Sequence, residues 1–225
     1  MLNTKRMRFP IDIILVCIRW YVAYPLSYRH IEEMMEERGV FVDHSSINRW
    51  AVRFLPLLEK TFRKYKRSVG VSWRMDETYI KVKGVWKYLY RAVDKEGKTV
   101  DFLLTAKRDK AAANWFFEKA MRHNGDPEKV TMDKSGANKS AIDGVNDDRE
   151  LPIEIRQIKY LNNIVEQDHR AIKRVTKPML SFKSFCSARN VLACIELMHM
   201  IRKSQMISTE ENQMSFAEQF YALAR

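Results

Sequence analysis

The chain has little cysteine and no long apolar run. Its three cysteines form no C-x-x-C pair and leave one without a partner, which is typical of reduced thiols and argues against a disulfide framework. The longest apolar stretch, 13–18, follows Asp12 and is far shorter than the roughly 20 residues that cross a bilayer. Asp12 also interrupts any signal-peptide pattern, so we expect a cytoplasmic protein with no membrane partner.

Several nucleotide and metal motifs are absent as well. The five histidines are too scattered for the short ligand spacings of structural zinc sites. There is no Walker A sequence, so no ATP requirement is expected. Internal repeats and low-complexity tracts are also missing, which leaves an ordinary globular chain.

Positive charge, by contrast, is in excess. The 225 residues hold 40 Lys and Arg against 28 Asp and Glu, a net charge of +12 and a pI near 9.6. Residues 1–70 carry half of this excess, and the segment 60–67 has five basic residues in eight. With 46% hydrophobic residues the chain forms packed cores, so its charge predicts a polyanionic partner such as nucleic acid. For 60–67 alone, a solvated helix face or a linker remains open.

The N-terminal part has the hydrophobic spacing of three helices. Ser27 can begin the second helix, Gly39 can end it, and Asp43, Ser45 or Ser46 can cap the third. A short helix, a turn with glycine and a following helix are typical of a helix-turn-helix. A three-helix bundle of purely structural purpose remains the alternative.

In a helix-turn-helix, exposed residues of the later helix, here the third, contact bases and phosphates. The expected DNA-binding residues are Ser45, Ser46, Asn48, Arg49 and Arg53. Ile47, Trp50 and Phe54 would hold this helix against its neighbours.

After residue 70 the hydrophobic period changes to two, which indicates strands. The predicted strands lie at 71–82, 86–93, 99–106, 129–132 and 154–158. The predicted helices lie at 109–122, 137–144, 163–173 and 182–203. This order predicts an α/β fold. We therefore expect a helical DNA-binding domain with a basic linker over 1–68 and an α/β catalytic domain over 69–225.

Three carboxylates occur where a strand or helix holds them in place. Asp76 is inside the first strand, Asp133 directly follows the fourth, and Glu166 is on the helix after the fifth. Such residues can build a divalent-metal site, because Mg²⁺ prefers hard oxygen ligands, and paired ions support phosphoryl transfer. Alternation places Asp76 on the strand face opposite Met75 and Glu77. A lysine partner for Asp76 and a simple turn role for Asp133 remain alternatives.

The chain resembles the DDE transposases of bacterial insertion sequences, most closely the IS-six-type group, over almost its whole length. The similarity rests on YRHIE at 28–32, VDHSSINRW at 42–50, WRMDETYIKV at 73–82, YLYRAVD at 88–94, DK at 133–134 and YLNNIVEQDHR at 160–170. These motifs together are highly specific.

The resemblance implies an RNase H-like core of mixed sheet and helices, preceded by an all-α helix-turn-helix domain. It implies Mg²⁺, replaceable by Mn²⁺, held by Asp76, Asp133 and Glu166. In this family a basic residue commonly follows the catalytic Glu by seven, which favours Glu166 over Asp168 and implies that Lys173 approaches DNA phosphate. A solvated surface role for Lys173 remains the alternative.

The function implied by the resemblance is transposition at the bacterial nucleoid. The protein would bind the element's terminal inverted repeats, hydrolyse the DNA ends and join the 3′-hydroxyls to target DNA, giving replicative cointegrates. Work on two ends of double-stranded DNA implies a homodimer or larger homo-oligomer. A helix-turn-helix DNA-binding protein with an inactive RNase H-like domain, an RNase H-type nuclease and a decayed copy remain alternatives.

Overall fold

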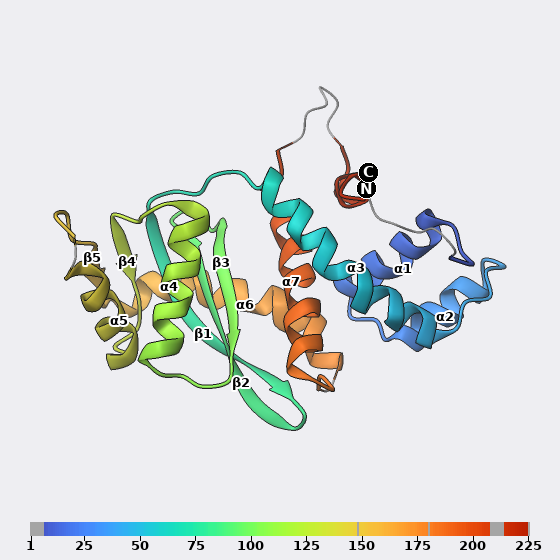
Figure 1. Ribbon diagram of the computed structural model, residues 1–225, viewed down its shortest axis with the longest axis horizontal. Helices are drawn as coiled ribbons and strands as arrows, with labels where there is room; N and C mark the ends of the chain where they lie inside the picture. The colour runs from blue at the N-terminus through green and yellow to red at the C-terminus, as the bar shows by residue number, and fades with distance from the viewer. Residues whose placement is uncertain (1–6, 148, 180, 208–213, 225) are drawn as a thin grey trace. The chain divides into compact units, whose positions relative to one another are not determined.

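The computed structural model describes residues 7–147, 149–179, 181–207 and 214–224. Its chain divides into two compact units (Figure 1). One is Ser68–Ala171, and the other joins the described residues up to Arg67 with those from Ile172 onward. The first break between the units adjoins the expected boundary at 68. The C-terminal segment packs with the N-terminal helices, although we expected it to belong to the same domain as the sheet. The functional extent of each domain stays a prediction.

The first unit is built on a five-stranded sheet with the order β3-β2-β1-β4-β5. The strands are β1 (Ser72–Val82), β2 (Val85–Asp94), β3 (Thr99–Thr105), β4 (Lys129–Thr131) and β5 (Glu154–Arg156). The first three are antiparallel neighbours, β4 runs parallel to β1, and β5 runs parallel to β4. This order of three antiparallel strands followed by two parallel ones is the RNase H-like arrangement and confirms the predicted fold class.

Tight turns join the three long strands. Lys83 and Gly84 have φ of 49° and 77°, as a two-residue type I′ hairpin between β1 and β2 requires. Between β2 and β3 the carboxylate of Asp94 accepts hydrogen bonds from the amides of Glu96 and Lys98, both at 2.9 Å. The Asp-Lys-Glu-Gly sequence at 94–97 forms this second turn.

Helices cover both faces of the sheet (Figure 1). One face carries α4 (Lys110–Asn124) and α5 (Gly136–Asn146), and the other carries α6 (Asn163–Thr176), which continues past Ala171 into the second unit. The main core lies under α4, where Phe116 stacks on Tyr90 of β2 with ring centroids 5.9 Å apart.

The second unit is helical. Its helices are α1 (Ile11–Ala23), α2 (Tyr28–Glu36), α3 (His44–Tyr65), α7 (Phe185–Arg202) and α8 (Phe216–Ala222). Ser27 and Asp43 are the N-caps of α2 and α3, as predicted, and α3 packs against α1, α2 and α7. The sequence did not predict α8 or the short 3-10 helices η1 (Lys159–Asn162) and η2 (Lys177–Met179). Within the described residues, no helix combines the length and apolar character needed to cross a membrane.

The core under α4 can be tested with neighbouring residues. Phe116 is fully buried, whereas the side chain of Trp115 is 64% exposed. We expect Phe116→Ala to lower the free energy of unfolding by about 3–5 kcal/mol, because it removes contacts and leaves a cavity. The control Trp115→Ala should change it by no more than about 0.5 kcal/mol. Urea unfolding measures both, and equal effects would contradict the assigned core.

Candidate functional site

The candidate site begins in the middle of β1. Asp76 pairs in register with Arg91 of β2, and Glu77 pairs with Tyr90, so the two acids start from opposite faces of the sheet. The Asp76 side chain is only 20% exposed. The sequence placed these faces correctly by alternation, and the ladder confirms that placement.

A short neighbouring strand brings a second acid to Asp76. β4 pairs with β1 only over Ser72–Arg74, and the chain leaves the sheet just after β4 at Asp133. One ligand oxygen each of Asp76, Glu77 and Asp133 lies within 4.8 Å of the others. Beyond Arg74, β4 no longer pairs with this edge of β1, so carboxylates that start from different faces can converge there.

Glu77 is the member of this cluster that the sequence analysis missed. Its side chain is 4% exposed, and it accepts a hydrogen bond of 2.8 Å from Asn138 Nδ2 of α5. Arg108 bridges the cluster, with Nη2 at 3.2 Å from Glu77 Oε2 and at 3.0 Å from Asp133 Oδ2. The signal in the sequence was an acid directly beside Asp76, but strict alternation assigned it to the other face.

Glu166 lies in the first turn of α6 and is exposed. In the described part of the chain it is not within the 4.8 Å group, although its charge acts on Asp76. Asn162 holds the start of α6 to the sheet by donating a hydrogen bond of 3.3 Å to the Met75 carbonyl. Nearby Asp168 is bound to Arg91 at 2.7 Å, so its carboxylate already has a structural partner.

The electrostatics of the cluster are unfavourable to negative charge. Burial raises the pKa of Asp76 to about 7. The negative charges of Glu77, Asp133 and Glu166 also raise this pKa, whereas a hydrogen bond from the Glu77 amide lowers it. His169 Nδ1 is 3.7 Å from Asp76 Oδ2. Asp133 Oδ1 is buried and has no hydrogen-bond partner among the described residues.

This arrangement fits a hard divalent cation. The converging atoms are carboxylate oxygens, which are the ligands that Mg²⁺ prefers. A cation would also compensate the charges that raise the pKa of Asp76 and satisfy the unpartnered oxygen of Asp133. Asp76, Glu77 and Asp133 can therefore supply ligands directly, while Glu166 is the nearby acid of α6.

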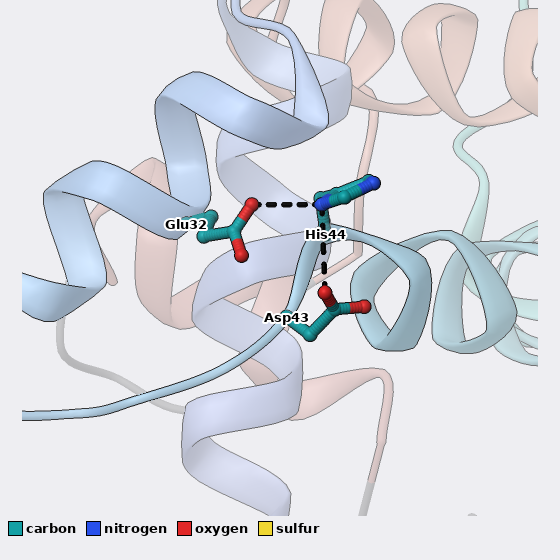
Figure 2. Close-up of side chains that lie close together, drawn as sticks. All are labelled: Glu32, Asp43 and His44. Atoms are coloured by element: carbon teal, nitrogen blue, oxygen red, sulfur yellow. Dashed lines mark hydrogen bonds and ion pairs between the residues drawn. The ribbon is translucent and has the colours of Figure 1, made fainter.

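A second cluster joins the two helices of the expected helix-turn-helix. His44 Nδ1, at the start of α3, lies 2.8 Å from Glu32 Oε2 of α2 and 3.6 Å from Asp43 Oδ2 (Figure 2). The sequence predicted Asp43 only as a cap and did not predict the contact between Glu32 and His44. This contact fixes the start of α3 against α2.

The expected DNA-binding residues lie along α3. Asn48, Arg49 and Arg53 are exposed, while Ser45 and Ser46 are partly buried in the first turn. Ile47, Trp50 and Phe54 are buried, as predicted for residues that hold the helix in place.

Within this set, Arg49 Nη2 donates a hydrogen bond of 2.8 Å to Ser46 Oγ, which places the guanidinium over the first turn of α3. On α6, the expected phosphate-contacting residue Lys173 is exposed. The DNA-binding roles of all these residues stay predictions.

Known proteins are similar to this chain over most of its length. The sequence profile of a family described as DDE domain matches residues 70–205. The transposase for insertion sequence-like element IS431mec of Staphylococcus aureus is 40% identical over 205 residues, covering 90% of each chain. The transposase for insertion sequence element IS257 in transposon Tn4003, also from Staphylococcus aureus, is 39% identical with the same coverage.

Solved structures resemble the chain more distantly. The HTLV-2 integrase catalytic core domain in complex with magnesium, in its trimeric form, has a TM-score of 0.38 and 13% identity, covering 71% of this chain and 86% of its own. The simian T-cell lymphotropic virus intasome in complex with PP2A regulatory subunit B56 gamma has a TM-score of 0.44 and 13% identity, covering 84% and 70%. The sheet order, and not these similarities, identifies the RNase H-like core.

The raised pKa of Asp76 predicts a pH-dependent stability. Folded Asp76 keeps its proton up to a pH of about 7, whereas an unfolded aspartate loses it near 3.8. Its contribution to stability is therefore complete below the unfolded pKa and is lost as the pH rises to 7. Without metal, the free energy of unfolding of Asp76→Asn, relative to that of the unmodified protein, should be larger at pH 8 than at pH 5.

Urea unfolding in EDTA at the two pH values measures this difference. Glu118→Gln, which changes an exposed acid on α4, is the matched control and should show no such trend. A pH-independent difference for Asp76→Asn would contradict a raised pKa at this position.

Proposed function

Because this chain belongs to the DDE transposases of bacterial insertion sequences, we propose that it cuts and joins DNA by Mg²⁺-dependent phosphoryl transfer. Its substrates are the terminal inverted repeats of its element and a target DNA, which places its action at the nucleoid. The observation that carries the proposal is the convergence of Asp76 and Asp133 with a raised pKa for Asp76. The raised pKa is typical of a functional carboxylate cluster.

The reaction consists of two in-line displacements at phosphorus. Water first attacks the phosphodiester at each end of the element and releases a 3′-hydroxyl, which then attacks a phosphodiester of the target. When bound, a pair of divalent ions activates the attacking oxygen and stabilises the leaving one. Asp76, Asp133 and Glu166 would hold the ions, with Glu77 beside them as a further oxygen donor, and Mn²⁺ would replace Mg²⁺. No covalent link to the protein is needed, so one site serves both steps.

The residues of this chain prepare the site before DNA arrives. Asp76 must lose its proton to act as a ligand, because only the carboxylate binds a cation. Asn138 orients Glu77, and Arg108 holds Glu77 and Asp133 together. The ion pair between Arg91 and Asp168 keeps α6, and with it Glu166, at the sheet.

Binding to the element ends is assigned to the helical unit. The exposed Asn48, Arg49 and Arg53 form one polar face of α3, opposite its buried residues. Arg and Asn are suited to base edges in the major groove, and the positive charge of the arginines favours phosphate. Two ends must be joined in one event, so the acting form is a homodimer or larger homo-oligomer, and the product is a replicative cointegrate.

The catalytic assignment is tested with isosteric changes of the acids. Asp76→Asn, Asp133→Asn and Glu166→Gln should each reduce strand transfer by about a thousand-fold or more, because metal-assisted charge stabilisation supplies several kcal/mol. End binding should stay within a few-fold. The assay joins a DNA fragment carrying both ends of the element to a target plasmid with Mg²⁺. Glu118→Gln is the control, and retained transfer by Asp76→Asn would overturn the assignment.

The DNA-binding assignment is tested on α3. Arg49→Ala should weaken binding to the element ends about ten-fold, as expected for loss of one base or phosphate contact. Arg122→Ala removes the same charge from the exposed surface of α4 and should change the affinity by less than two-fold. Fluorescence anisotropy with labelled end duplexes in EDTA gives both affinities. Equal losses would show that net charge, and not this face of α3, determines binding.

A further inference from the structure

The β1–β2 hairpin extends beyond the rest of the sheet (Figure 1). The last pair between β2 and β3 is Tyr88 with Thr105, and β4 pairs only with Ser72–Arg74 of β1. The two strands nevertheless continue to pair with each other up to Val82 and Val85. Neither β3 nor β4 therefore pairs with the outer part of this hairpin.

Aromatic side chains gather on one face of this projecting part. Tyr79 pairs with Tyr88, and Lys81 pairs with Trp86, so alternation puts all four side chains on the same face. Tyr79 is 50% exposed and Trp86 is 58% exposed. The Tyr79 ring lies 5.5 Å from that of Tyr88 and 6.4 Å from that of Trp86. The alternate residue Ile80 is only 3% exposed, so a single aromatic face is presented to solvent.

The charged residues of the hairpin between Glu77 and Asp94 are all basic. Between Glu77 and Asp94 the sequence contains Lys81, Lys83, Lys87 and Arg91 and no acidic residue. Lys81 Nζ lies 5.7 Å from the centre of the Trp86 ring, within the range of a cation–π interaction. An exposed aromatic face with surrounding lysines complements a partner that has flat π-systems and negative charge.

We propose that Tyr79, Trp86 and Lys81 form a stacking platform for unpaired DNA bases beside the candidate active site. Stacking on aromatic side chains requires the face of a base, which paired DNA keeps inside its stack, so the platform favours single-stranded or frayed DNA. Tyr79 lies two residues from Glu77 on the same strand face, or about 7 Å along the strand. Bases held there would flank the phosphodiester at the carboxylates. This inference rests on the proposed function, because it assumes that DNA is the substrate.

The test compares two DNA probes that share one duplex part, each bound to the full chain in EDTA. One is a fully paired duplex of an element end, and the other is the same duplex with a single-stranded thymidine tail. Trp86→Ala should weaken binding of the tailed probe about ten-fold, as expected for loss of one stacked base, and binding of the paired probe by less than two-fold. Trp86→Phe keeps an aromatic face and should recover most of the affinity.

The control Trp115→Ala removes the exposed tryptophan of α4 and should bind both probes as the unmodified protein does. Equal binding of the tailed probe by Trp86→Ala and the unmodified protein would overturn the platform. The platform would also be overturned if Trp86→Ala changed the oligomeric state in sedimentation but left the DNA affinity unchanged, since that result assigns the face to protein contacts. If the unmodified protein binds neither probe, the proposed function fails together with this inference.

Discussion

Arg91 and Asp168 form an ion pair inside the α/β unit, with Nη2 and Oδ2 at 2.7 Å and side chains that are 0% and 9% exposed. A guanidinium stays charged, so its burial without a carboxylate would cost several kcal/mol. The strand register places Arg91 directly opposite Asp76. The pair therefore fixes α6 against the strand face that carries Asp76. Glu166, two residues before Asp168, owes its position near that carboxylate to the same contact.

Much of the fold could be predicted from the sequence, because hydrophobic period and capping residues act locally. The caps Ser27 and Asp43 and the five strands follow from such signals. The packing of 172–225 with the N-terminal helices could not, since it depends on which apolar faces meet after folding. Pro56 lies inside α3, where proline removes a backbone donor. The helix continues because the buried Leu55 and Leu58 on either side of the proline keep it packed.

The candidate site was predictable in its acids but not in its contacts. Asp76 lies inside a strand and Asp133 follows the end of one, where the backbone holds them in place, and the structure brings their carboxylates together. Alternation assigned Glu77 to the opposite strand face. It predicts the face from which a side chain starts, but it does not predict where a long side chain reaches beyond the edge of a strand. Arg108 lies on the loop after β3, distant in sequence from the acids that it bridges. No local pattern encodes such a bridge.

The carboxylate cluster runs against the charge of the whole chain, which is +12. A phosphodiester would be repelled by these acids, so they cannot attract DNA until their charge is compensated. In the metal-free protein the compensation comes from Arg108 and from the proton on Asp76. In the proposed function, affinity for DNA comes from separate cationic surfaces, for which the exposed arginines of α3 and the lysines of the β1–β2 hairpin are the candidates. Because the proposed DNA-binding surfaces are separate from the carboxylate cluster, the acids can lie close together without lowering the affinity for DNA.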